Sequence, residues 1–351
     1  DVRTACELLR FCRGAVIAAA ALGPVLLFFL LLPVCGLRPA LLLALCGAVA
    51  LPLVERSFGS LLYHEHLVLL FITGHAVASY RLWLGHSRRP LRTALLAAVL
   101  LALALHGWKA TGFYYLIHLG ILTCFLPLAH NLPHLLPRVR VALLTSLPVL
   151  FAAGLLSPHL RTDGFWHSPA LIYHLLLALF LFGATRSSMP FRRRVALAIG
   201  AAAAATAGLA LLAGLLLPAT GSYGHVWGVF FAQVRHGFTK PADPLLLTPD
   251  ARLYWVPPYQ HASSLRFAND LGVLALLGLA AAVVAVRRRT RQGDDTALLA
   301  LLGALATGSA YFLFFKTATF FVPHLLFLLA AATPAITSRR ALIAGLALLA
   351  L

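Results

Sequence analysis

The sequence predicts an all-α protein, a polytopic bundle of membrane-spanning helices. Hydrophobic residues make up 61% of the chain, only 11% of the residues are charged, and the mean hydropathy is +0.90. A soluble globular domain carries about 25% charged residues, so this class is excluded. The one long polar stretch, residues 218–268, interrupts an otherwise apolar chain and predicts a large loop at one membrane face.

A spanning helix needs about 20 mostly apolar residues, and about twelve segments of the chain are candidates. These are roughly 15–36, 39–54, 61–82, 91–106, 113–128, 141–156, 168–184, 195–217, 269–286, 296–315, 319–337 and 341 to the end. The chain starts at Asp1 without Met and stops at Leu351 within an apolar run. We therefore expect residues 1–351 to form a single transmembrane domain that is truncated at both ends.

Orientation follows from the arginines, because basic turns stay on the cytoplasmic side. If the N-terminus lies outside, 17 of the 28 basic residues fall on cytoplasmic turns. They are Arg38, Arg81, Arg88, Arg89, Arg92, Arg138, Arg140, Arg186, Arg192, Arg193, Arg194, Arg287, Arg288, Arg289, Arg291, Arg339 and Arg340. The 218–268 loop then faces the periplasm or a lumen, and part of it is expected to be re-entrant or interfacial.

The formal net charge is +18. In a soluble domain such a charge would suggest binding to nucleic acid, but in this chain most of the positive charge belongs to the cytoplasmic turns that set the membrane orientation. We expect no nucleic-acid partner. The outer positive charges are more informative, because topology rules disfavour them there, and they could hold a phosphate. These residues are Arg56, Lys109, Arg235, Lys240, Arg252, Arg266 and Lys316.

The sequence gives little support for a metal site, a nucleotide site, a catalytic triad or a transporter. His64 and His66 are two residues apart, which is a poor helical chelate beside the i, i+4 spacing of zinc sites, so no metal site is predicted. For His75, His118 and His174, which lie within spans, we expect interhelical hydrogen bonds. No dinucleotide or P-loop fingerprint and no Ser/His/Asp arrangement stands out. An internal duplication and acids at span centres are also absent, which disfavours a transporter.

Cations, a few carboxylates and aromatic side chains thus gather at the outer face of a many-helix protein. Enzymes that use polyprenyl-phosphate sugars need this combination, together with a lipid groove between helices. Composition makes such an enzyme the leading candidate.

Four local strings carry a more specific resemblance. Residues 51–58, Leu-Pro-Leu-Val-Glu-Arg-Ser-Phe, look like the Leu-Arg-Glu-Ser-Phe stretch of the Dumpy-nineteen family, the tryptophan C-mannosyltransferases of the GT-C superfamily. Residues 107–113, Gly-Trp-Lys-Ala-Thr-Gly-Phe, are similar to that family's Pro-Trp-Gln-x-x-x-Phe turn. His225 followed by Lys-x-x-Asp-x-Leu-Leu-x-Thr at 240–248 resembles the family's loop. Lys316 followed by Val-Pro-His at 322–324 is similar to its late Lys and Thr-Pro-His.

The four strings occur in the family's order, at outer loops or helix ends, and twelve spans after an external N-terminus would follow one missing span of a thirteen-helix protein. There are also departures. The family's Arg-Glu is reversed to Glu55-Arg56, its Gln is Lys109, and the spacing after His225 is stretched. These departures leave the identity of the sugar and of the acceptor open.

The resemblance implies an inverting glycosyltransferase of a bacterial inner membrane or the endoplasmic reticulum, with its active site facing the periplasm or lumen. Its donor would be polyprenyl- or dolichyl-phosphate mannose and its acceptor a tryptophan of an exported polypeptide. Membrane lipids would surround it, with no covalently bound cofactor and no divalent metal expected.

The resemblance also suggests roles for individual residues. The catalytic carboxylate is expected upstream of Asp1, with Glu55 as a weaker candidate within this chain. Arg56, Lys316 and His324 would bind the donor phosphate, because guanidinium and ammonium groups stabilise its charge. The residues expected to line the substrate-binding loop are Trp108, Lys109, His225, Lys240 and Asp243.

Structural alternatives stay open for several of these residues. Lys316 could snorkel to the headgroups, His324 could be a hydrogen-bond donor at a helix start, and Glu55-Arg56 could form a local salt bridge. Trp108 suits an interfacial aromatic belt, and Asp243 and Thr248 suit helix caps.

Three functions also remain open beside C-mannosyl transfer. They are a GT-C glycosyltransferase with another sugar or acceptor, a membrane transporter of a small solute, and a non-catalytic scaffold.

Overall fold

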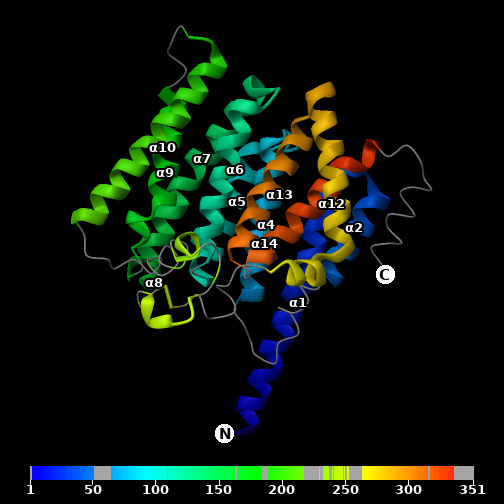
Figure 1. Cartoon of the computed structure of the whole chain (residues 1–351), viewed down its shortest axis with the longest axis vertical. Coiled ribbons are helices and arrows are strands. Elements are labelled where there is room, and N and C mark those ends of the chain that lie inside the picture. The colour runs from blue at the N-terminus through cyan, green and yellow to red at the C-terminus, as the bar shows by residue number, and fades with distance from the viewer. Residues whose placement is uncertain are drawn as a thin grey trace.

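The protein forms a bundle of α-helices, seen in the computed structural model in Figure 1. The structure describes residues 2–50, 65–108, 110–162, 164–183, 189–216, 229, 232–236, 239, 241–247, 249, 251–252, 263–314 and 317–335. Within these ranges there is no β-strand. The expected all-α class is confirmed.

The long helices follow one another along the chain with short turns between most of them. They are α1 (Val2–Cys35), α2 (Leu37–Val49), α4 (Glu65–Trp83), α5 (Pro90–Gly107), α6 (Thr111–Leu128), α7 (Leu132–Leu156), α9 (Pro169–Gly183), α10 (Phe191–Leu216), α12 (Ser264–Gln292), α13 (Asp295–Leu313) and α14 (Ala318–Ala332). Short elements accompany them: α8 (Pro158–Thr162), η1 (Phe165–His167), η3 (Pro244–Leu246) and η7 (Thr333–Ala335).

Six of the described helices are long and apolar enough to cross a membrane, as judged by length and composition. They are α5, α6, α7, α10, α12 and α13, and four shorter apolar helices accompany them. Large apolar side chains point outward from several of these helices, as with Leu179, Phe182 and Leu276, each more than half exposed. Such a surface suits contact with lipid.

Eleven of the twelve expected segments contain a helix, and the twelfth, from 341 onward, lies outside the described residues. Two helices begin well before the expected start: α1 at Val2 and α7 at Leu132. Polar residues near these starts lowered the local hydropathy without ending the helix. In α7, for example, the Arg140 guanidinium is satisfied by two hydrogen bonds to the Leu181 carbonyl, at 3.1 and 2.6 Å.

The expected polar loop is also shorter at its far end than 218–268. Helix α12 starts at Ser264, and the Ser263 hydroxyl accepts a hydrogen bond from the Arg266 amide at 3.1 Å. A serine at this position caps the helix and fixes its first turn.

Helix α14 lies in the middle of the bundle (Figure 1). It packs against α1, α2, α12 and α13, and thirteen of its 15 residues are buried. A helix that is apolar on every side is expected to be enclosed by others. Any side chain of α14 that carries a polar group therefore lies in the interior.

At one end of the bundle, which we call the Asp295 end, side chains join the α6–α7 turn to the α12–α13 turn. The Asp295 carboxylate accepts hydrogen bonds from the amides of His130 and Asn131, at 2.6 and 3.0 Å, and from the Arg289 guanidinium at 3.1 Å. Arg289 also donates to the Leu128 carbonyl. The chain alternates between ends, so the α4–α5 turn, where Gly85 lies against the Arg138 side chain, is at this end as well.

At the opposite end, which we call the α14 end, the chain enters α14. Trp108 of the α5–α6 turn lies against Phe320, His106 bonds Ser157 at 3.0 Å, and the Gln233 amide donates to the Leu313 carbonyl at 2.8 Å. The last contact brings part of the expected polar loop to this end.

Candidate functional site

The residues expected to form the site fall into two groups. Trp108, Asp243 and His324 belong to the described part of the chain. The others lie outside the described residues: Glu55, Arg56, Lys109, His225, Lys240, Thr248 and Lys316. The described part of the site consists of the first group and the side chains around it.

Trp108 ends α5 and turns the chain toward α6. Its amide donates to the Ala104 carbonyl at 3.1 Å, and the Thr111 hydroxyl donates to the same carbonyl at 2.8 Å. The indole is 7% exposed, with its centroid 5.8 Å from that of Phe320. An interfacial belt position is therefore wrong for this residue. The inward turn after α5 buries the ring against the first turn of α14.

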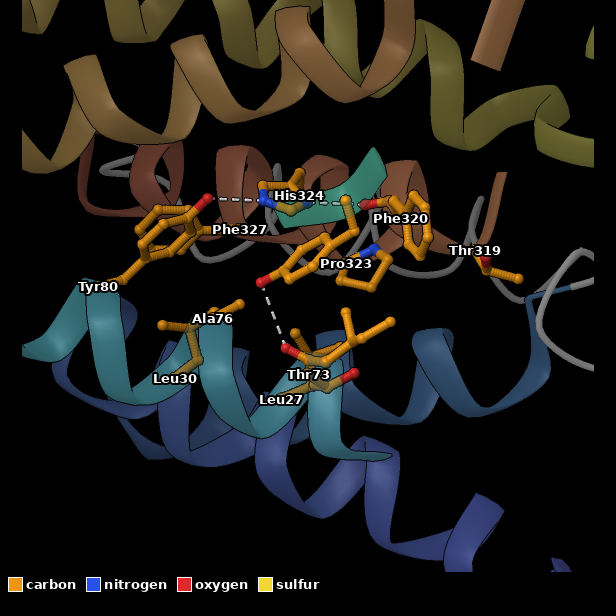
Figure 2. Close-up of a pocket in the computed structure, with 12 residues that line it drawn as sticks. Leu27, Leu30, Thr73, Ala76, Tyr80, Thr319, Phe320, Pro323, His324 and Phe327 are labelled. Atoms are coloured by element: carbon orange, nitrogen blue, oxygen red, sulfur yellow. Dashed lines mark hydrogen bonds between the residues drawn. The ribbon is translucent and has the colours of Figure 1, made fainter. Parts of the chain in front are cut away.

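His324 lies within α14, and both of its ring nitrogens are occupied (Figure 2). Nδ1 is 2.7 Å from the Phe320 carbonyl, which can only accept, so Nδ1 carries the proton. Nε2 therefore accepts from the Tyr80 hydroxyl, 2.7 Å away. In this arrangement the imidazole joins α14 to α4, and a phosphate could reach it only by displacing the tyrosine.

A small pocket lies beside this pair, between α1, α4, α6 and α14 (Figure 2). Its volume of about 20 Å³ is enough for about one water molecule. The walls are mainly apolar, with Leu27, Ala76 and Phe327 among them, and Tyr80, His324, Thr73 and Thr319 supply polar atoms. The pocket is too small for a sugar.

The histidines within the helices only partly match the expected interhelical hydrogen bonds. His75 bonds the Ala97 carbonyl at 2.9 Å, and His174 bonds the Tyr115 hydroxyl and the Ser146 hydroxyl. For His118 the expectation is wrong, because neither ring nitrogen has a partner among the described residues. Its ring is held by aromatic contacts instead, stacked on Tyr80 with centroids 5.7 Å apart and tilted against Trp83 at 4.6 Å.

Asp270 is a buried carboxylate that sequence reasoning did not single out. One of its oxygens accepts from the Arg266 guanidinium and from the Tyr311 hydroxyl, both at 3.2 Å. Two residues after it, Gly272 interrupts α12 with a φ of +40°. The i, i+4 spacing of Arg266 and Asp270 at the start of an apolar helix is the signal that could have identified the pair.

Asp243 acts as a helix cap, as its sequence context allowed. Its side chain accepts from the Leu245 amide at 2.8 Å and starts the short helix η3. Among the described residues no group of three His, Cys, Asp or Glu side chains is arranged to hold a metal ion.

The polar groups therefore gather near the α14 end. Trp108 contacts Phe320 there, and the Gln233 side chain donates a hydrogen bond to the last residue of α13. Phe321 stacks on Tyr311, and the Tyr311 hydroxyl bonds Asp270, which brings this carboxylate to the same region. Buried aromatic surface and a carboxylate thus lie around the start of α14. The His324 imidazole lies further along this helix, where it bonds Tyr80 near the end of α4.

No family model matches the chain, and no curated protein matches it either. Solved structures do match. The chain is similar to the archaeal oligosaccharyltransferase AglB from Archaeoglobus fulgidus, in complex with an inhibitory peptide and a dolichol-phosphate. The TM-score is 0.62 and the identity 16%, over 95% of this chain and 42% of that one. A second structure of the Archaeoglobus fulgidus oligosaccharyltransferase, in complex with zinc and sulfate, has a TM-score of 0.57 and an identity of 14%, over 95% and 38%.

The chain thus spans less than half the length of the proteins whose structures it matches. At this identity the likeness concerns the fold alone. The bundle shares the fold of the matched part of these archaeal oligosaccharyltransferase structures.

Proposed function

We propose that this protein is a GT-C glycosyltransferase that takes its sugar from a polyprenyl-phosphate donor. The proposal rests on the fold match, over 95% of the chain, to an oligosaccharyltransferase whose structure was solved with a dolichol-phosphate and a peptide. A lipid-linked donor and a polypeptide acceptor suit a site at the end of a helix bundle, where both lipid and aqueous phases are within reach.

The narrower form of the proposal is C-mannosyl transfer to a tryptophan of an exported protein, which the four strings of the sequence support. The bond between the anomeric carbon and the phosphate oxygen breaks while the anomeric carbon bonds to C2 of the indole, with inversion. The ring then loses the C2 proton to a carboxylate, and polyprenyl phosphate leaves with the bonding pair. Cations near the phosphate stabilise the charge that develops on it.

In this proposal Arg56, Lys316 and His324 bind the donor phosphate. In the sequence Lys109 follows Trp108 and Lys316 precedes Thr317, and Trp108 contacts Phe320 in the first turn of α14. His324 would have to exchange the Tyr80 hydroxyl for a phosphate oxygen.

The remaining residues would shape the acceptor side. Trp108, Lys109, His225, Lys240 and Asp243 would line the wall formed by the outer loop. The burial of Gln233 against α13 supports a loop that covers this end. The catalytic carboxylate would come from upstream of Asp1, or else from Glu55. The α14 end would then face the periplasm or lumen within a single membrane domain.

The test is a transfer assay with the full-length protein in liposomes. The donors are polyprenyl-phosphate mannose and polyprenyl-phosphate glucose, and the acceptor is a tryptophan-containing peptide. Addition of one hexose to the indole, measured by mass spectrometry, is the expected result with mannose. Transfer from glucose alone would redirect the proposal to another sugar, and no transfer from either donor would overturn it.

The assignment of the phosphate site is tested separately. Arg56→Ala and Lys316→Ala should each lower turnover by about 100-fold, the size of effect seen when a group that stabilises a developing oxyanion is removed. Arg92→Ala at the Asp295 end is the control and should leave turnover unchanged. Unchanged turnover in all of Arg56→Ala, Lys316→Ala and His324→Ala would show that the phosphate binds elsewhere.

A further inference from the structure

A pocket that combines charge with apolar surface lies away from the proposed active site, at the Asp295 end. It has a volume of about 680 Å³, within the range of small-ligand sites. We call it the α4–α5 pocket, because the end of α4, the following turn and the start of α5 form most of it. Its polar lining is Arg81, His86, Ser87, Arg88, Arg89 and Thr93.

The polar side of this pocket is strongly basic. The three arginines that line it have no carboxylate within salt-bridge distance among the described residues, whereas Arg288 and Arg289 at the same end are paired with Asp294 and Asp295. Arg138 on α7 adds to the charge, since its Nη1 lies beside Gly85 and has no hydrogen-bond partner in the described part of the chain.

His86 reports the same positive environment. Burial, together with the guanidinium groups of Arg81 and Arg138, lowers the pKa of this imidazole below its usual value. The surrounding arginines have no carboxylate partner among the described residues, so an anion that entered the pocket would meet several uncompensated cations.

The other side of the pocket is apolar and reaches the outer surface of the bundle. Leu26 of α1, Val77 of α4 and Leu100 of α5 line it, and Leu96 beside them is 53% exposed. Gly74 allows these helices to approach, because a Cβ there would lie 3.1 Å from the Leu100 side chain and 3.5 Å from that of Leu26. The basic lining thus continues directly into surface that suits an acyl chain.

We propose that the α4–α5 pocket binds one anionic phospholipid, with its phosphodiester on Arg81, Arg88 and Arg89 and an acyl chain along Leu96 and Leu100. Guanidinium groups bind phosphate oxygens bidentately. Basic pockets between transmembrane helices on the cytoplasmic side are a recurring place for such headgroups. The apolar wall distinguishes this ligand from free phosphate, which would gain nothing from the leucines. The proposal does not depend on the transferase activity.

The experiment compares lipid retention by two variants that lose the same charge at the same end of the bundle. Arg88→Gln/Arg89→Gln removes two exposed arginines that line the pocket. Arg92→Gln/Arg291→Gln removes two exposed arginines that do not. Full-length wild type and both variants are equilibrated with vesicles of phosphatidylglycerol and phosphatidylcholine, purified in mild detergent, and analysed for bound lipid by native mass spectrometry.

The wild type should retain one phosphatidylglycerol in preference to phosphatidylcholine. Each arginine removed from the pocket should lower this retention by about fivefold, the equivalent of about 1 kcal/mol per basic residue at an anionic surface. The Arg92→Gln/Arg291→Gln control should retain as much as the wild type. Thermal unfolding of each variant in detergent confirms that it is folded.

Three results would overturn the proposal. Equal loss of phosphatidylglycerol in both double variants would mean that the lipid is attracted by the general charge of this end. Displacement of the lipid by millimolar inorganic phosphate would show that the apolar wall makes no contribution. Equal retention of phosphatidylcholine, which has the same acyl chains, would show that the arginines do not select an anionic headgroup.

Discussion

The Tyr80 hydroxyl donates a hydrogen bond to Nε2 of His324 across 2.7 Å and so joins α4 to α14, between residues 244 positions apart in the chain. The rings also pack edge to face, with centroids 5.7 Å apart. The pair fixes the orientation of the central helix relative to the helix that faces it.

Replacing Tyr80 by Phe removes this hydrogen bond and leaves the buried Nε2 of His324 without its donor. We expect a loss of about 1 kcal/mol in the free energy of unfolding, since interhelical hydrogen bonds within membranes contribute about this much. Tyr114→Phe is the matched control, because its hydroxyl makes a longer bond of 3.4 Å to the Ile72 carbonyl. Denaturant titration in detergent measures both, and a larger effect for Tyr114→Phe would contradict the ranking.

The two partners of Asp270 should contribute unequally to stability. The Arg266 side chain is 43% exposed, so Arg266→Gln should cost only about 0.5 kcal/mol. Asp270→Ala also removes the acceptor of the Tyr311 hydroxyl in the interior, and we expect about 2 kcal/mol. Thermal unfolding of the two variants side by side checks the order. Equal shifts in melting temperature would mean that the buried tyrosine bond contributes little.

Gly85 should tolerate alanine poorly. Its φ is +80°, and a Cβ would come within 2.6 Å of Arg138 Nη1. Alanine at a positive φ destabilises by about 1 kcal/mol or more. Gly120, within α6 and with nothing near its missing Cβ, is the contrasting position, where alanine should stabilise by about 0.5–1 kcal/mol. Opposite signs in unfolding experiments are the expected outcome; the same sign at both sites would argue against a left-handed turn at Gly85.

His86 should make stability depend on pH. Its folded-state pKa is below the usual 6.5, so between these two values the unfolded chain binds more protons than the folded one. The contribution of this residue is thus complete above pH 6.5 and is lost as the pH falls through this window. Unfolding free energies from pH 7.5 to pH 5 should fall less steeply in His86→Gln than in the wild type. Parallel curves would show that neither burial nor the two guanidinium groups lower the pKa of this ring.

Much of the fold could be predicted from the sequence, because spans are long and their apolar composition is a local property. The expected 91–106 and 113–128 agree with α5 and α6 to within two residues. The start of α7 could not be predicted in this way, because the Arg140 side chain is satisfied by the Leu181 carbonyl of another helix, which local hydropathy does not reveal.

Less of the candidate site than of the fold could be predicted from the sequence. The polar residues of the outer turns were visible, but interior pairs such as Tyr80–His324 and Asp270–Tyr311 join distant positions and arise only when the helices pack. His118 shows the same limit, since an imidazole in a span favours a hydrogen bond on chemical grounds, whereas the surrounding rings of Tyr80 and Trp83 hold it instead.

Asp295 has a consequence for how the bundle can move. Its carboxylate ties the α6–α7 turn to the start of α13, and Arg192 at the start of α10 adds a bond of 3.2 Å to the His130 carbonyl. Helices that are fastened together at one end can separate only by tilting about that end. A lipid tail that slides between them would therefore find the widest opening farthest from this pivot, beside the first turn of α14.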